Sequence, residues 1–187
     1  MRIVGGRHRG RRLVAPAGIE VRPTSERARE ALFNILAHGN FRADGTSPIT
    51  GARVLDGFAG SGALGLEALS RGADHAVFME NARAALKAIG DNIRLLGETD
   101  RATVMAVDAA KPPPAIATCH VVLLDPPYGS GLAAPALEKL AAGGWFAPGA
   151  ICSVEVSAKE PLAVPAGFKV IDERRHGRAK LILLRAP

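Results

Sequence analysis

The sequence has few cysteines and no long hydrophobic run. Its two cysteines, Cys119 and Cys152, lie far apart, and Cys152 falls in a strand-like segment, so we expect buried free thiols rather than a disulfide. Cys119 precedes His120, but no second cluster of ligands completes a zinc site, and we expect no metal. No apolar run approaches the roughly 20 residues that span a bilayer, and the N-terminus lacks the apolar core of a signal peptide. We therefore expect a cytoplasmic protein with no membrane partner.

The chain has no acidic residue before Glu20. Its 187 residues carry a formal net charge of +6. Five arginines precede that acid: Arg2, Arg7, Arg9, Arg11 and Arg12. Interleaved glycines add little bulk, so this segment could lie along a phosphate backbone. A second basic group, residues 174–180 around Gly177, predicts a hairpin tip, and whether it contacts nucleic acid is left open. A solvated charged face is the alternative for both groups.

A glycine-rich turn lies between an expected strand at 52–56 and a helical stretch at 66–71. Gly60 and Gly62 permit positive φ and let a ligand approach the backbone, while free N–H groups of the helix start can face a carboxylate or phosphate. With Gly65 they satisfy the pattern G-x-G-x-x-G, which is also typical of dinucleotide sites.

Two acids near this turn favour a cationic ligand over a dinucleotide. Asp56 ends the first expected strand, where its carboxylate would repel a pyrophosphate. Glu80 ends the next apolar strand, at the position of a ribose-binding acid. S-adenosylmethionine carries a sulfonium, an ammonium and a ribose diol but no phosphate, so these acids suit it. An NAD-linked oxidoreductase is the more remote alternative.

The tetrapeptide Asp125-Pro126-Pro127-Tyr128 follows the apolar run 121–124 and predicts a substrate site at a strand end. Both prolines lack an N–H, and Pro127 pushes Pro126 toward an extended conformation, so the Pro126 carbonyl has no ladder partner. Asp125 and this carbonyl could accept the two N–H groups of a planar amine and help its nitrogen aim at a methyl donor. Tyr128 offers a face for stacking a flat substrate. A turn that merely ends a strand is the alternative.

The predicted elements alternate between strands and helices. We expect a hairpin from 2–4 and 12–14, helices at 25–36, 66–71, 83–96 and 135–142, and strands at 52–56, 76–80, 102–107, 121–124, 150–156, 168–171 and 181–184. Thr24 or Ser25 can cap the first helix. Such a chain forms a mostly parallel sheet with helices on both faces and a ligand crevice at the strand carboxyl ends. Four acids fall at those ends: Asp56, Glu80, Asp108 and Asp125.

These residues resemble the class I S-adenosylmethionine-dependent methyltransferases and, within them, the bacterial small-subunit ribosomal RNA guanine-N2 methyltransferases of the RsmD type. The resemblance runs nearly end to end and rests on the segments 2–11, 22–34, 56–68 and 125–128. It implies an α/β, Rossmann-like class I methyltransferase fold with a mostly parallel seven-stranded sheet, an antiparallel C-terminal strand and a small N-terminal hairpin plus helix extension. Residues 1–40 would form that basic, RNA-contacting extension, packed on the core, and residues 52–187 the methyltransferase domain.

The resemblance implies transfer of a methyl group from S-adenosylmethionine to the exocyclic N2 of a guanine in 16S ribosomal RNA. The implied catalytic residues are Asp125, Pro126 and Tyr128; the implied cofactor-binding residues are Asp56, Phe58, Ala59, Gly60, Ser61, Gly62, Glu80, Asn81, Asp108 and Ala109; the implied RNA-binding residues are Arg7, Arg9, Arg11, Arg12 and Arg22. The expected partner of this monomer is ribosomal RNA or a small-subunit ribosomal particle. Because Asp-Pro-Pro-Tyr is shared with other enzymes, adenine N6 of nucleic acid or a protein glutamine amide is the alternative acceptor.

Two departures from the family pattern concern the cofactor side. Ala82 stands where the family usually has an acid two places after Glu80, which removes any cofactor contact from that side chain. The run Pro112-Pro113-Pro114 forbids the helix that usually follows Asp108-Ala109, so the wall near the adenine is less defined.

Overall fold

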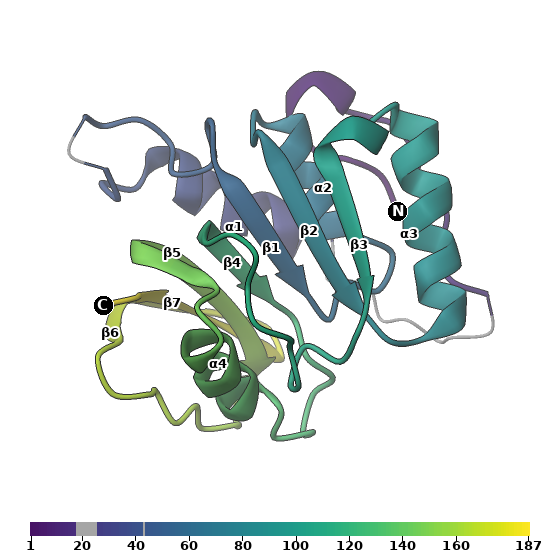
Figure 1. Cartoon of the computed structure of the whole chain (residues 1–187). Coiled ribbons are helices and arrows are strands. Elements are labelled where there is room, and N and C mark those ends of the chain that lie inside the picture. Colours follow the sequence, from purple (N-terminus) through teal and green to yellow (C-terminus); the bar gives the residue numbers. More distant parts are fainter. Residues whose placement is uncertain (18–25, 43) are drawn as a thin grey trace.

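The computed structural model describes residues 1–17, 26–42 and 44–187, and these contain one seven-stranded sheet (Figure 1). The strands are β1 (Arg53–Gly57), β2 (His75–Glu80), β3 (Ala102–Ala106), β4 (Cys119–Leu124), β5 (Phe146–Ser157), β6 (Lys169–His176) and β7 (Ala179–Arg185). Their order is β3-β2-β1-β4-β5-β7-β6, and β7 runs antiparallel to both of its neighbours while β1 to β5 pair in parallel. The predicted mostly parallel sheet with an antiparallel strand near the C-terminus is confirmed.

Helices cover both faces of this sheet. The described α-helices are α1 (Glu26–His38), α2 (Ala63–Ser70), α3 (Arg83–Leu96) and α4 (Ala133–Ala142), with short 3-10 turns η1 (Gly6–His8) and η2 (Thr99–Arg101). Apolar side chains of α1, α2 and α3 form one buried cluster with Val54, Val121 and Leu123. Those of α4 form a second cluster with Leu55 and Val122, on the opposite side of the same strands. The alternation of strand side chains therefore places α4 alone on its face (Figure 1).

The N-terminal segment folds back on itself, but less regularly than predicted. A single antiparallel bridge joins Arg2 and Arg12, and the turn between them contains η1 instead of two continuous strands. Gly6 and Gly10 lie between the two predicted strands and adopt φ of 73° and 82°, which helps the chain turn back on itself. Ile3 is fully buried in the cluster of α1 and α2, so this segment shares the core of the sheet. The division into an extension and a catalytic domain stays a hypothesis.

Several element boundaries differ from prediction: β5 begins four residues earlier, β6 ends five residues later, and α2 also starts early. This helix begins at Ala63, three residues earlier than expected, and Gly62 precedes it with φ 78° and no side-chain cap. The Gly65 N–H instead donates to Asp56 Oδ2 at 2.8 Å, so a carboxylate from β1 satisfies a donor in the first turn. By contrast, α3 has the predicted bounds 83–96. The caps predicted at Thr24 or Ser25 lie outside the described residues.

Both cysteines are buried as free thiols, as predicted. Burial raises the pKa of Cys119 to about 11 and raises that of Cys152 still further, so neither is activated as a nucleophile. In the described part of the chain, no helix has the length and apolar character to cross a membrane.

Candidate active site

A cavity of about 1060 Å³ opens at the carboxyl ends of the central parallel strands. All four acids predicted at strand ends line it: Asp56, Glu80, Asp108 and Asp125. Asp125 directly follows β4, which lies beside β1, the strand that holds Asp56. The sheet order changes direction between these two strands, which is where α/β sheets bind ligands. The four acids predicted at strand ends therefore share one cavity, and their roles in a functional site stay a prediction.

The glycine turn after β1 forms one wall of the cavity. Gly60 and Gly62 have φ of 57° and 78°, so the predicted left-handed conformations are present. Phe58 also has a positive φ of 62°, an uncommon conformation for a residue with a side chain. A Cβ built on Gly60 would meet no atom within 4 Å, so a ligand can approach this backbone. Gly65 has another role, because a Cβ there would collide with the ring of Phe78.

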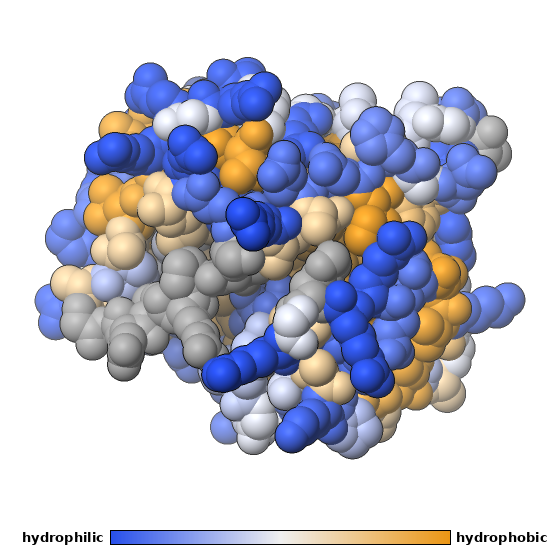
Figure 2. All heavy atoms as spheres, turned by 180° about the vertical axis from the view of Figure 1, so that it is seen from behind, coloured by the Kyte–Doolittle hydropathy of each residue, from blue (hydrophilic) through white to orange (hydrophobic). Residues whose placement is uncertain are grey.

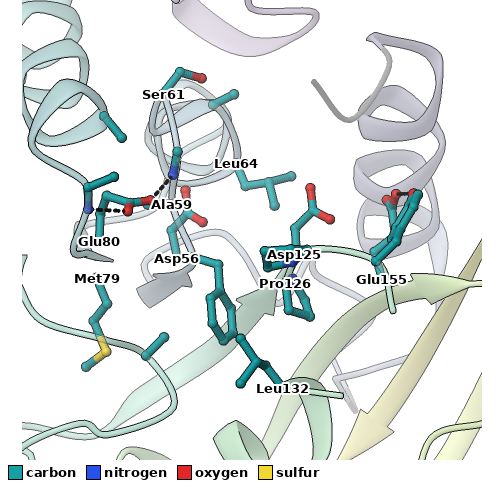
Figure 3. Close-up of a pocket in the computed structure, with 18 of the residues that line it drawn as sticks. Asp56, Ala59, Ser61, Leu64, Met79, Glu80, Asp125, Pro126, Leu132 and Glu155 are labelled. Carbon is teal, nitrogen blue, oxygen red and sulfur yellow. Dashed lines mark hydrogen bonds between the residues drawn. The ribbon is translucent and has the colours of Figure 1, made fainter. Parts of the chain in front are cut away.

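Glu80 holds this turn in shape. Its carboxylate accepts the N–H of Gly60 from the turn and those of Asn81 and Ala82 that follow it, each at 2.8 Å (Figure 3). The side chain that was predicted to bind ribose therefore also organises the backbone that surrounds the ligand. Its contact with a ribose stays a prediction.

Asp56 is almost completely buried, with 1% of its surface exposed. Burial raises the pKa of Asp56 well above its usual range, the Gly65 N–H acts in the opposite direction, and the charges of Asp125 and Glu80 raise the pKa further. Three carboxylates close to one cavity create a negative potential that a cationic ligand would relieve.

The wall next to β3 contains Val107, Asp108 and Ala109. Asp108 Oδ1 accepts the N–H of Ala110 at 2.8 Å, and Ala109 is buried. Between β3 and β4, where every residue is described, no helix forms, as the proline run predicted. Trp145 instead fixes this segment by donating its indole N–H to the Pro113 carbonyl at 2.8 Å.

The Asp-Pro-Pro-Tyr segment lies at the other end of the cavity. Pro126 is buried, Asp125 is partly buried, and Tyr128 is 43% exposed. The Tyr128 hydroxyl donates to Glu155 of β5, which also lines the cavity (Figure 3). Sequence reasoning missed Glu155, although an acid within the apolar strand segment 150–156 was a usable signal.

Four of the arginines predicted to bind RNA are described, and none of the four lines the cavity. Arg7 pairs with the buried Glu98, and Arg11 donates to the Leu95 carbonyl at 3.1 Å. Arg9 and Arg12 are exposed, and neither guanidinium pairs with an acid in the described part of the chain. Arg22 lies outside the described residues.

Three other arginines line the cavity, of which Arg29 is buried and two are exposed. Arg27 of α1 and Arg178, which lies between β6 and β7, both line it and are both exposed. The second basic group thus does form a hairpin tip, and Gly177 within it has φ 62°. Basic side chains therefore stand at the rim of a cavity with acidic walls.

Comparisons with known proteins agree with this geometry. The family model described as conserved hypothetical protein 95 matches residues 1–185. The chain is 38% identical over 180 residues to ribosomal RNA small subunit methyltransferase D of Escherichia coli, covering 95% of this chain and 86% of that protein. The Haemophilus influenzae protein of the same name is 34% identical over 181 residues, covering 95% and 89%.

Solved structures give the same result. A putative methyltransferase from Escherichia coli, yhhF, superposes with a TM-score of 0.80 at 36% identity, covering 100% of this chain and 97% of that one. A putative methylase from Haemophilus influenzae, HI0767, gives a TM-score of 0.79 at 31% identity over 99% and 97%. The chain therefore belongs to the conserved hypothetical protein 95 family, the class I methyltransferases of the RsmD type.

Proposed function

We propose that this protein is a cytoplasmic enzyme that transfers a methyl group from S-adenosylmethionine to N2 of a guanine in small-subunit ribosomal RNA. The observation that carries the proposal is the cavity itself, which joins an acidic, glycine-lined end to the Asp125-Pro126-Pro127-Tyr128 end. Membership of the methyltransferase family and the names of the relatives support this assignment.

The glycine-lined end suits S-adenosylmethionine, which supplies an electrophilic methyl group when bound. Asp56 and the backbone of residues 60–62 would hold its methionine portion, and Glu80 would accept the ribose hydroxyls. Asp108 and Ala109 would face the adenine, while Phe58, Ala59, Ser61 and Asn81 would complete the wall. The fit rests on charge, because burial raises the pKa of Asp56 and a cationic ligand would stabilise its ionised form.

The other end suits an exocyclic amine. The lone pair of such an amine is delocalised into the base, so the nitrogen is a poor nucleophile in the ground state. Asp125 and the Pro126 carbonyl would accept its hydrogens and favour a pyramidal nitrogen whose lone pair is directed at the methyl donor. Tyr128, exposed at the cavity, would stack on a base turned out of its helix or loop.

The charge distribution suits RNA as the substrate. Arg27 and Arg178 stand at the cavity rim, and Arg9 and Arg12 project from the N-terminal segment. Figure 2 shows the molecule from behind, where many hydrophilic side chains are interspersed with apolar areas. Phosphates of a strand whose base enters the cavity could pair with these groups.

Nucleoside analysis tests the proposal directly. The purified protein, S-adenosylmethionine and unmodified small-subunit ribosomal RNA, free or in reconstituted particles, should yield N2-methylguanosine. N6-methyladenosine would instead support the adenine alternative, and methylated glutamine in the protein fraction would support the amide alternative. Tight binding of NADH with none of S-adenosylmethionine would favour an oxidoreductase.

A further inference from the structure

Glu155 lies at the same level of the sheet as Asp125. Strands β4 and β5 pair in parallel, and Leu124 lies opposite Val154. Asp125 and Glu155 directly follow these two residues, and neighbouring strands of a sheet are about 4.8 Å apart. Both side chains line the cavity, and they lie near each other in Figure 3. Glu155 is therefore next to the place proposed for the reacting amine.

Glu155 is nearly buried in the wall of the cavity. The residue is 9% exposed. A carboxylate in such a position costs free energy unless hydrogen bonds compensate for the lost water. The Tyr128 hydroxyl donates one such bond. A carboxylate offers about four acceptor positions, so a ligand donor can be accommodated as well.

Guanine presents a donor that matches this position. Its Watson–Crick edge carries the N1–H directly beside the N2 amino group, whereas adenine has a lone pair at N1 beside its N6 amino group. If Asp125 and the Pro126 carbonyl accept the hydrogens of the amine, the N1–H needs a further acceptor next to them. An N1 lone pair at the same place would face a carboxylate and be repelled.

We propose that Glu155 selects guanine by accepting its N1–H while Asp125 and Pro126 hold the N2 amino group. This inference rests on the proposed function and deepens it. The Asp-Pro-Pro-Tyr segment holds an amine of either base, so selection between guanine and adenine requires another group in the cavity. Asp56, Glu80 and Asp108 lie toward the glycine turn, whereas Glu155 lies beside Asp125.

The experiment replaces the mapped target guanine with 2-aminopurine, which keeps the 2-amino group but has a lone pair at N1. Small-subunit ribosomal RNA with either base is methylated in single-turnover reactions by wild-type protein, Glu155→Gln and Glu138→Gln. The wild type should prefer guanine by about 10- to 100-fold, the loss expected when a buried donor and its acceptor are no longer paired.

Glu155→Gln should reduce this preference to about 3-fold or less, because its amide can donate to the N1 lone pair of 2-aminopurine. Glu138→Gln is the matched control: it makes the same change on the exposed side of α4, outside the cavity lining, so the preference should persist. Unchanged affinity for S-adenosylmethionine shows that the variants are folded.

Two results would overturn the inference alone, both with N2-methylguanosine still formed from the guanine RNA. One is equal rates for both bases with the wild type, which requires no variant to fold. The other is a Glu155→Gln variant that keeps the wild-type preference, which would limit Glu155 to holding Tyr128. Absence of N2-methylguanosine in the wild-type reaction would instead overturn the proposed function, and the inference with it.

Discussion

Asp56 combines a helix-capping contact with a charge that is costly to bury. Its raised pKa means that the folded state holds the proton more tightly than the unfolded state. The contribution of this group to stability is therefore complete below the unfolded pKa of about 3.9, and declines as pH rises from there toward the folded pKa. Without a cation in the cavity, Asp56 destabilises the protein at neutral pH.

Asp56→Asn tests whether the buried charge of Asp56 destabilises the protein. The amide oxygen can still accept the Gly65 N–H, so the free energy of unfolding at pH 8 should rise by about 1 kcal/mol or more. At pH 4 the wild-type carboxyl is protonated in the folded state. The gain in unfolding free energy of the variant over the wild type should therefore be smaller at pH 4 than at pH 8. Urea denaturation at both pH values measures this, and calorimetry should show weaker S-adenosylmethionine binding. Equal stability at pH 8 would contradict the charge argument.

Asp125 should separate binding from chemistry. Its carboxylate is proposed to orient an amine that becomes nucleophilic only as the transition state forms, so its contribution should appear in the rate. Asp125→Ala should lower single-turnover methylation by about 10²- to 10⁴-fold, while S-adenosylmethionine affinity changes far less. The methylation rate of Asp125→Asn should lie between those of the wild type and Asp125→Ala, because asparagine keeps an acceptor oxygen but loses the charge. Near-normal methylation by Asp125→Ala would show that the Pro126 carbonyl suffices.

At the scale of elements, local sequence predicted α3 because its apolar periodicity is regular and Gly97, with φ 69°, ends it. It misplaced the start of α2, because the capping group is Asp56 of another element. It also overstated the N-terminal hairpin, since η1 lies within its turn. Boundaries set by neighbouring residues were predictable, whereas those set by distant contacts were not.

Glu67 of α2 is such a distant contact, and it joins three elements. Its carboxylate is fully buried, accepts the Val4 N–H at 2.9 Å, and pairs with Arg71 at 2.7 Å and with Arg29 of α1 at 3.5 Å. Glu67→Ala would leave two buried or half-buried cations without their acid, and should lower the free energy of unfolding by about 3–5 kcal/mol.

The matched control is Asp91→Ala on α3, which removes the acid shared by the exposed cations Lys87 and Arg94. Surface pairs of this kind contribute about 0–1 kcal/mol. Denaturant unfolding of both variants gives the comparison. Similar losses for the two would show that the Glu67 cluster does not hold the N-terminal segment in place.

At the scale of the whole molecule, the acidic end of the site was predictable because four strands end in acids and parallel strands end at one edge. Glu155 could have been noticed as an acid in an apolar strand, but its place beside Asp125 follows from the order of β4 and β5 in the sheet. The same holds for Arg27 and Arg178, which reach one cavity from opposite ends of the chain. Sheet order, rather than local pattern, brings these residues together.

RNA binding should reflect this distribution of charge over the molecule. Replacing Arg9 and Arg12, or Arg27 and Arg178, with Ala should weaken binding to small-subunit ribosomal RNA. It should also flatten the dependence of log K on log salt by about 0.7–0.9 for each lost phosphate contact. Arg94→Ala is the control, because Arg94 already pairs with Asp91 and should hardly alter the slope. Filter binding at several salt concentrations measures the slopes. An unchanged slope for the Arg9 and Arg12 variant, with a reduced one for the Arg27 and Arg178 variant, would move the RNA surface from the N-terminal segment to the cavity rim.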